Sequence, residues 1–371
     1  MDFQLSDEQV LLRDTTRDLL SRTYDPESRN KIIETDLGWS RDVWSQLADT
    51  GILSLGFEPD ESGQIEIMVV LTEIGRRLAP EPVVHAALAP GALIAEHGSD
   101  AQKQLLDEVA AGQKLLAFAH LETGHRKPTA TVATRAVLQG NSWNLSGTKN
   151  PVLAGDCADT LVVSAALPDG GTGLFLVEGE AVNRHPYPTF DGQRGAQIEL
   201  NSAPAEPLGD AADVQDASPA IRDAIVRIQS ALCAEAVGAM EEALRLTTDY
   251  LKTRKQFGVT LNKFQALTQR AADMYVSLEL ARSMSFYAAM SIADGNLDPV
   301  IASRAKLQIG RSGRHIAQEA IQLHGGIGMT AEYPVGHYAA RLTAIEHTLG
   351  SSQDHLQVLI DQIGDHDLAR L

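Results

Sequence analysis

The chain has 371 residues, of which 44% are hydrophobic, so it can bury a large core and form one to three domains. Its formal net charge is -18, which makes nucleic acid and anionic membrane surfaces unexpected partners, because binding them requires a concentrated basic face. No run of about twenty apolar residues is present, and the first residues, MDFQLSDEQ, lack the basic start and apolar stretch of a secretion signal. We therefore expect a cytoplasmic protein that does not enter a membrane.

Residues 1–115 have the pattern of a helical domain. Ser6 and Gln9 form a potential capping box, in which a hydroxyl and an amide side chain satisfy the free backbone groups at the start of a helix. That first helix would carry Val10, Leu11 and Leu20. Further helices are expected around residues 43–48, 65–78, 86–96 and 101–110.

Residues 116–212 have the pattern of a β domain. Short runs rich in β-branched residues alternate with turn signals such as Gly140-Asn141 and Asp169-Gly170-Gly171. The expected strands fall in residues 129–138, 143–145, 160–165, 174–177 and 196–200. This spacing predicts a small antiparallel sheet or barrel.

Residues 213–371 return to long helical patterns, at 217–251, 261–293 and 299–321, the last ending at Gly325-Gly326. Such lengths indicate a helical bundle, part of whose surface is expected to form a subunit interface. The predicted fold class is therefore α+β, with a helical domain, an antiparallel β domain and a helical bundle in that order. Cys157 and Cys233 lie far apart and form no metal-ligand spacing, so no metal site is predicted.

Four segments together resemble the acyl-CoA dehydrogenase family. Residues 250–258 read YLKTRKQFG and precede Phe264-Gln265, and residues 322–328 read QLHGGIG and precede Glu332-Tyr333-Pro334. Residues 44–51 and 73–80 fit the same family, and the order of the four segments matches over nearly the whole chain. The resemblance implies a helical domain, a central β domain and a C-terminal four-helix bundle. It also implies a tetramer in which FAD lies across a dimer interface, with one subunit clamping the ADP half of its neighbour's FAD.

The same resemblance assigns cofactor-binding roles residue by residue. Arg254 and Gln256 match positions near the pyrophosphate of the partner's FAD, where a guanidinium offers a planar fork of donors. Phe257 would pack on the cofactor, and Gln265 would face its adenine side. A loop at the adenosine end corresponds to Gln322, Gly325, Gly326 and Gly328. Without the resemblance, both segments would be read as ordinary helix ends with a basic cap and a glycine stop.

Two segments depart from the family where the flavin ring should bind. Residues 119–126 read AHLETGHR and lack the Ser-Asp that family members use for the ring. Residues 147–153 read GTKNPVL in place of a Gly-x-Lys-x-Trp-Ile-Thr/Ser pattern. Proline has no amide proton to donate and leucine has no hydroxyl. We therefore expect the chain's own ring pocket to be lost.

The catalytic base is missing as well. Most family members place a glutamate at the position of Leu349, and a minority place the base at the position of Ile228. Neither aliphatic side chain can accept a proton, so no catalytic residue is predicted. Glu346 and Glu235 are the nearest carboxylates and remain open as unconventional bases.

The departures favour a heterotetramer of the α2β2 type. The chain resembles the smaller, non-catalytic subunit of actinobacterial α2β2 dehydrogenases that act on steroid side chains, as in cholesterol degradation. The resemblance implies a catalytic acyl-CoA dehydrogenase paralogue as partner, an acyl-CoA substrate bound mainly by that paralogue, and an electron-transfer flavoprotein or similar acceptor. Two alternatives stay open: an active homotetramer that uses Glu346 or Glu235, and a structural homologue that binds no flavin.

Overall fold

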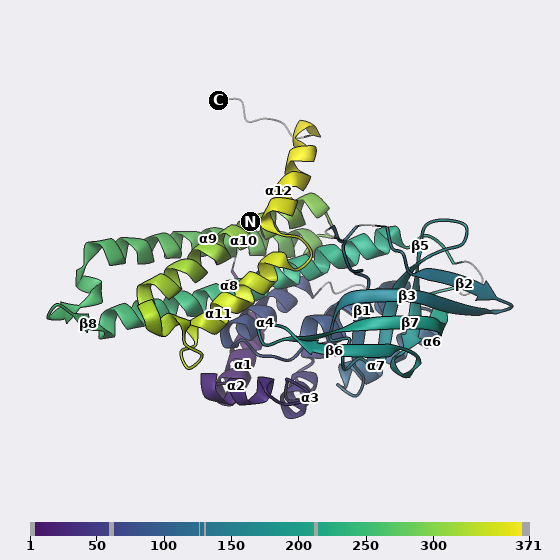
Figure 1. Cartoon of the computed structure of the whole chain (residues 1–371), viewed down its shortest axis with the longest axis horizontal. Helices are drawn as coiled ribbons and strands as arrows, with labels where there is room; N and C mark the ends of the chain where they lie inside the picture. Colours follow the sequence, from purple (N-terminus) through teal and green to yellow (C-terminus); the bar gives the residue numbers. More distant parts are fainter. Residues whose placement is uncertain (1–3, 59–62, 126, 130, 211–213, 366–371) are drawn as a thin grey trace. The chain divides into compact units, whose positions relative to one another are not determined.

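The computed structural model describes residues 4–58, 63–125, 127–129, 131–210 and 214–365. Its chain divides into two compact units (Figure 1). The helical unit comprises Met1–Asn30, Met68–Ala79 and Gln229–Leu371, and the barrel unit comprises Lys31–Ile67 and Pro80–Ile228. The domain boundaries expected from the sequence near residues 115 and 212 stay predictions. Within the described residues, no helix combines the length and hydropathy that a bilayer span requires.

The first helix begins where the sequence predicts, whereas the helix at Pro26–Ile33 was not predicted. The Ser6 hydroxyl accepts from the backbone N–H of Gln9 at 3.2 Å, and the Gln9 side chain accepts from Ser6 N–H at 3.0 Å, so the capping box is confirmed. Leu20 is fully buried, whereas Leu11 is 68% exposed and faces away from the core. The helices of this part of the chain are α1 (Asp7–Thr23), α2 (Pro26–Ile33), α3 (Arg41–Asp49), α4 (Gln64–Arg77), α5 (Ala89–His97), α6 (Asp100–Lys103) and α7 (Leu105–Ala110).

The barrel unit contains a seven-stranded sheet that closes on itself. Its strands are β1 (Leu116–Ala119), β2 (Arg135–Gln139), β3 (Ser142–Leu153), β4 (Thr160–Ala166), β5 (Thr172–Glu178), β6 (Asn183–Pro188) and β7 (Arg194–Pro207). They run in the order β1-β4-β2-β3-β7-β5, β5 also pairs with β4, and β6 pairs with β7. Most pairs are antiparallel as predicted, but β1 and β2 run parallel to β4.

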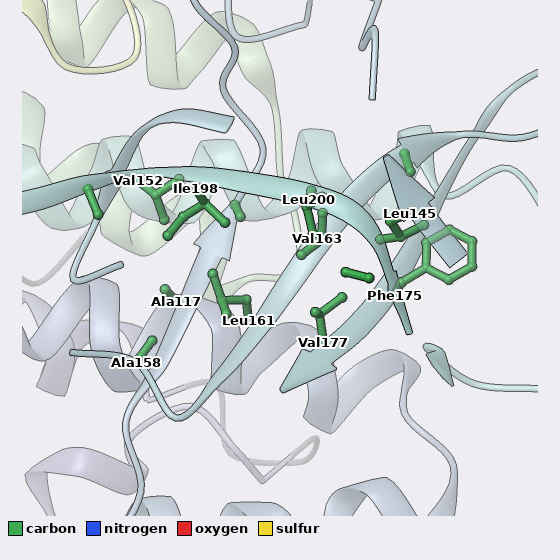
Figure 2. Packing of buried hydrophobic residues seen from close by; sticks show 14 of the residues in the cluster. Ala117, Leu145, Val152, Ala158, Leu161, Val163, Phe175, Val177, Ile198 and Leu200 are labelled. Atoms are coloured by element: carbon green, nitrogen blue, oxygen red, sulfur yellow. The ribbon is translucent and has the colours of Figure 1, made fainter. Parts of the chain in front are cut away.

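The interior of the barrel is apolar. Alternate residues of its strands point inward, as the period of two requires. Figure 2 shows this packing, in which Leu161, Val163, Phe175 and Ile198 are completely buried.

The C-terminal helices are confirmed, with ends that differ by a few residues from the prediction. They are α8 (Ser218–Thr253), α9 (Gln265–Ala293) and α10 (Pro299–His324), followed by α11 (Val335–His347) and α12 (Ser352–Asp361). Between α8 and α9 lies a small hairpin of β8 (Lys255–Gln256) and β9 (Val259–Thr260). A 3-10 turn, η5 (Gly325–Met329), follows α10.

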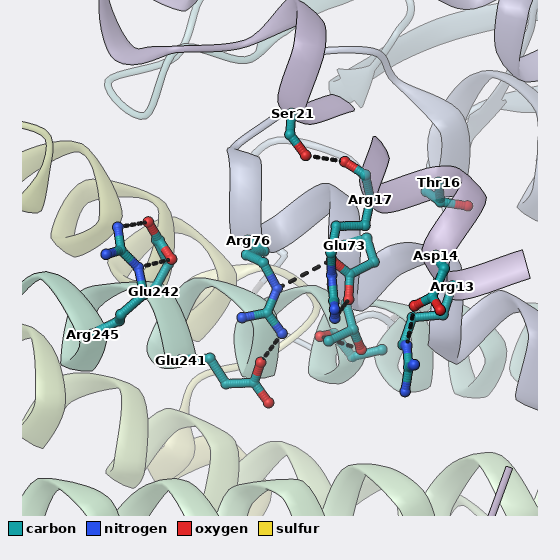
Figure 3. Close-up of polar contacts among 12 residues, drawn as sticks. Arg13, Asp14, Thr16, Arg17, Ser21, Glu73, Arg76, Glu241, Glu242 and Arg245 are labelled. Atoms are coloured by element: carbon teal, nitrogen blue, oxygen red, sulfur yellow. Dashed lines mark hydrogen bonds and ion pairs between the residues drawn. The ribbon is translucent and has the colours of Figure 1, made fainter. Parts of the chain in front are cut away.

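Two glycines let α4 and α8 approach each other closely within the helical unit. A methyl group on Gly75 would overlap the backbone carbonyl of Glu235, and one on Gly238 would overlap the carbonyl of Thr72. Beside this crossing, Glu73 accepts from Arg17 at 2.8 Å and from Arg76 at 3.1 Å, and Arg76 also pairs with Glu241 (Figure 3). Of these ion pairs, Arg76–Glu241 joins α4 to α8, whereas Arg17–Glu73 joins α1 to α4.

We expect Gly238→Ala to lower the free energy of unfolding by about 1–3 kcal/mol, because the added methyl forces the two helices apart. Urea denaturation followed by circular dichroism measures this loss. Gly364→Ala is the matched control, since the space around Gly364 is open. Equal stability of the two variants would show that the helix crossing tolerates a side chain.

Candidate functional site

Three aromatic rings join the ends of α8 and α10. The ring of His324 lies 4.6 Å from that of Tyr250 and 4.9 Å from that of Tyr333, measured between centroids. The His324 Nδ1 is 2.7 Å from the carbonyl of Ala320, and burial lowers the pKa of the imidazole, which favours its neutral form. The first sequence motif, residues 250–258, includes the end of α8, and the second, residues 322–328, includes the end of α10. The ring cluster therefore holds both motifs at one end of the helical unit.

The first motif forms the exposed β8–β9 hairpin. Phe257 and Gly258 occupy its two-residue loop, and both have positive φ, at 53° and 82°. Positive φ at both loop residues matches the twist of a tight hairpin, but it is unfavourable for phenylalanine. Phe257 is nevertheless 91% exposed, and its ring makes an edge-on contact with that of Phe264, 6.2 Å away between centroids. A strained and exposed aromatic residue is typical of a binding position rather than of a folding requirement.

Arg254 and Gln256 lie at the base of this hairpin, and both are exposed. Lys255 follows Arg254 directly and is exposed as well. Among the described residues, no carboxylate forms an ion pair with Arg254 or Lys255. Gln265 is the first residue of α9 and is also exposed.

The second motif forms the end of α10 and the turn η5. Gln322 is exposed in the last turn of the helix, and Gly325 has a φ of 69°. A Cβ at Gly325 or Gly326 would meet no atom within 4 Å, so the backbone there is open to a ligand or a partner. Gly328 is buried and packs against His324 and Ile321, so its role in the structure is internal packing.

The two segments that depart from the flavin-ring pattern meet in the barrel unit around a buried lysine. The Lys149 ammonium is fully buried and donates to Glu122 Oε1 at 2.7 Å and to Ser164 Oγ at 3.2 Å. Glu122 also accepts from the backbone N–H of Ala133 at 2.6 Å and from that of Thr134 at 3.0 Å. These bonds fix the 120–123 segment against β3.

Electrostatics keeps this pair ionised. Burial alone would raise the pKa of Glu122, but the hydrogen bonds from Lys149 and Thr134 lower it to about 2. Burial lowers the pKa of Lys149 to about 8, and Glu122 partly opposes that effect. Both side chains are therefore charged at neutral pH and are joined by a hydrogen bond within the barrel unit.

The backbone at residues 150 and 151 offers no hydrogen-bond donor. The Asn150 N–H already donates to the carbonyl of Leu121 at 2.8 Å, and the Asn150 side chain accepts from Tyr187 at 2.8 Å. Pro151 has no N–H. Hydrogen bonds thus link residues 119–125 to residues 147–153. Arg126 lies outside the described residues.

The two open candidates for the catalytic base are both engaged. Glu235 is buried in the helical unit and accepts two hydrogen bonds from the Arg341 guanidinium, at 2.6 and 2.8 Å. Glu346 is buried too, and accepts from Arg314 at 2.9 Å, from Ser352 N–H at 3.0 Å and from Ser352 Oγ at 2.9 Å. Glu346 therefore caps α12, and both carboxylates have structural partners.

The positions at which the family resemblance places the base are aliphatic, and their backbone is well fixed. Ile228 is buried. Leu349 follows α11 with a φ of 57°, and its carbonyl accepts from the Gln229 side chain at 3.0 Å.

Family comparisons agree with these motifs. Residues 6–113 match the N-terminal domain of acyl-CoA dehydrogenases, and residues 224–364 match the C-terminal domain of the same family. The chain belongs to the acyl-CoA dehydrogenase family. The predicted fold class, with an N-terminal helical domain, a central β domain and a C-terminal helical domain, is confirmed.

Individual relatives cover almost the whole chain. A chain of the Tcur3481-Tcur3483 steroid ACAD is 31% identical, has a TM-score of 0.88, and overlaps 97% of this chain and 98% of its own length. The acyl-CoA dehydrogenase IpdE2 of Mycolicibacterium smegmatis is 28% identical over 364 residues, covering 96% of this chain and 98% of IpdE2. The ChsE4-ChsE5 complex from Mycobacterium tuberculosis contains a chain with a TM-score of 0.88 at 24% identity, covering 99% of this chain and 100% of that chain, which supports the fold alone.

FAD is the cofactor of acyl-CoA dehydrogenases, and the exposed end of the helical unit fits the ADP half of that molecule. Arg254 and Lys255 supply cationic donors for phosphate oxygens, Phe257 supplies an aromatic face, and Gly325 and Gly326 leave room for close backbone approach. At residues 150 and 151 the backbone has no donor for a flavin ring, because the Asn150 N–H is bonded to the carbonyl of Leu121 and Pro151 has no N–H.

The sequence did not reveal the groups that hold the site together. The ring cluster assigns a packing role to His324, which had no predicted function, and the carboxylate partners Arg341 and Arg314 were not foreseen. Aromatic residues within or just after a motif, such as Tyr250 and Tyr333, are the only sequence signal that could have indicated this packing.

We expect Glu235→Leu to lower the free energy of unfolding by about 3–5 kcal/mol, because the buried Arg341 guanidinium would lose the carboxylate that accepts two of its hydrogen bonds. The double variant Glu235→Leu with Arg341→Met should regain most of this loss, since both charges are then absent. Asp18→Ala, which removes an exposed ion pair with Arg22, should change stability by less than about 1 kcal/mol. A single Glu235→Leu variant as stable as the wild type would rule out the structural role of Glu235.

Proposed function

We propose that this chain is a subunit of an FAD-dependent acyl-CoA dehydrogenase that clamps the ADP half of a neighbouring subunit's FAD and supplies no catalytic base. The observation that carries this proposal is the contrast between the two candidate regions. The end with Arg254 and the glycine turn is cationic, exposed and open, whereas the ring-binding segments and the candidate carboxylates are closed by internal hydrogen bonds.

Dehydrogenation of a CoA thioester requires a group that this chain lacks at the expected positions. A base must remove the proton α to the thioester carbonyl within hydrogen-bonding reach, while hydride leaves the β-carbon for the flavin. Leu349 and Ile228 have no acceptor atom. A partner subunit with an intact glutamate would supply the base, and FAD bound there would accept the hydride.

Arg254 is the central residue of the proposed clamp. Its guanidinium can offer two parallel N–H donors to a phosphate oxygen pair, which an ammonium cannot do. Gln256 would donate or accept beside it, and Phe257 would cover the cofactor from the hairpin tip. Gln265 and Gln322 would meet the adenosine side, where Gly325, Gly326 and Gly328 shape the turn.

The proposed partner is a catalytic paralogue in an α2β2 heterotetramer. An apolar surface of α9, formed by Tyr275, Val276 and Leu280, is half-exposed in the single chain and is suited to a subunit contact. The 31% identity to a chain of a steroid ACAD supports a sterol side-chain acyl-CoA as substrate, bound mainly by the partner. An electron-transfer flavoprotein or similar acceptor would reoxidise the flavin, and the assembly would work in the cytoplasm.

Both alternatives conflict with specific observations. An active homotetramer would require Glu235 or Glu346 to give up arginine partners at 2.6–2.9 Å. A flavin-free homologue would have no ligand to account for the strained and exposed Phe257, or for Arg254 and Lys255, which form no ion pair among the described residues.

Arg254→Ala should weaken FAD binding in the co-expressed complex by roughly ten- to a hundredfold, because a charge-assisted hydrogen bond contributes about 1.5–3 kcal/mol. Arg254→Lys should restore only part of the affinity, since a point charge lacks the fork. The measurement is the FAD retained after dilution, with gel filtration to confirm that both chains stay together.

Lys252→Ala is the matched control, since Lys252 is an exposed cation at the same helix end. It should leave FAD retention within about twofold of wild type, an effect as small as those of other exposed charges. Full retention of FAD in Arg254→Ala, or equal losses in both variants, would contradict the clamp.

A further inference from the structure

The barrel unit contains a large open groove. Its volume is about 1540 Å³, which exceeds the roughly 300–1,000 Å³ typical of small-molecule sites. It is lined by Leu105 and Glu108 of α7, by Gln104 just before that helix, and by residues of the β2–β3 hairpin. The size and openness suit a polypeptide segment better than a small ligand.

The floor of the groove is apolar and accessible. Val137 and Leu138 of β2 are 45% and 50% exposed, and both line the groove. Trp143 lies beside them, partly buried, with its ring 5.4 Å from that of Phe175 in the barrel core. Leu105 and Leu176 complete the floor from the facing elements. Exposed side chains of this kind in a concave site are characteristic of interaction surfaces.

The rim of the groove is acidic. Among the described residues it carries five carboxylates and one cation, and that cation, Lys114, is already 3.6 Å from one of the five, Glu108. Asp169 and Glu178 are exposed, and within the described part of the chain no basic side chain forms an ion pair with either. The other two acidic residues of the rim are Glu206 and Asp216. The uncompensated negative charge attracts a basic occupant and repels an anionic one.

One wall of the groove is also a strand edge. β2 pairs with β3 along its whole length, from Arg135 to Gln139. Its other edge is registered with β4 only at Arg135, opposite Ala166. Past Arg135, the edge that carries Val137 and Leu138 can accept an added strand through backbone hydrogen bonds.

We propose that this groove binds an extended segment of a partner protein in which basic and apolar residues alternate. In an added strand, neighbouring side chains point to opposite faces, so an apolar set can pack on Leu138 and Trp143, which pair across β2 and β3, while a basic set remains free to meet the acidic groups of the groove. CoA and FAD are anionic and would be repelled. A second copy of this chain, with a net charge of -18, is a poor match as well. The groove and the proposed flavin clamp are independent of each other.

The test uses a short synthetic peptide of alternating lysine and valine, titrated into the full chain. Trp143 fluorescence reports binding, since Trp39 and Trp44 are buried. The double variant Asp169→Lys with Glu178→Lys should weaken binding by about tenfold or more. Glu180→Lys is the matched control, because Glu180 is exposed but does not line the groove, and it should bind within about twofold of wild type.

The proposal predicts that a peptide of alternating glutamate and valine does not bind. Equal binding of both peptides, equal effects of the double variant and Glu180→Lys, or no binding of the lysine peptide would each overturn it. Concentration-dependent self-association that Val137→Lys abolishes would also overturn it, by showing that the groove serves a second copy of the chain.

Discussion

The contact of His324 with Tyr250 and Tyr333 is the constraint on which the candidate site depends. It joins the end of α8 to the end of α10, although the two motifs are separated by more than sixty residues of sequence. Because the imidazole is buried and held by the carbonyl of Ala320, the helix ends cannot slide past each other without breaking that packing. The hairpin and the glycine turn can therefore be exposed and open without losing their relative placement.

The buried carboxylates of the helical unit are engaged in structural contacts. A buried carboxylate can act as a base only if its lone pairs are available at the substrate, and those of Glu235 and Glu346 are directed to arginines and to the start of α12. At residues 150 and 151 the backbone likewise offers no donor for a flavin ring, because the Asn150 N–H is bonded to the carbonyl of Leu121 and Pro151 has no N–H. A subunit with this distribution of used and unused groups can contribute to a neighbour's cofactor site without holding a complete site itself.

Much of this architecture could be predicted from local sequence. The Ser6–Gln9 capping box and the long apolar periods predicted their helices, because capping and amphipathicity are local. The strands β1 and β6 were not predicted. β1 has four residues rich in alanine, and β6 contains Pro186 and Pro188, which are tolerated because it lies at the edge of the sheet and pairs only with β7.

The partners of the buried charges could not be predicted from the sequence, because they are fixed by tertiary packing. Glu235 and Arg341 are 106 residues apart, and Lys149 and Glu122 are 27 apart on separate elements. No local pattern encodes such pairs. The resemblance indicated that the expected base positions were aliphatic, but only the structure shows that the nearby carboxylates are already engaged.

We propose that this chain contributes only a clamp to its neighbour's FAD. The most direct test of this proposal is the flavin content of the native complex. The chain would be purified with its catalytic partner, the flavin released by denaturation, and FAD counted against the amount of each chain. The account predicts one FAD for every two chains, because this subunit contributes a clamp but no ring pocket. A ratio of one FAD per chain would contradict it, since each copy of this chain would then hold a complete cofactor site.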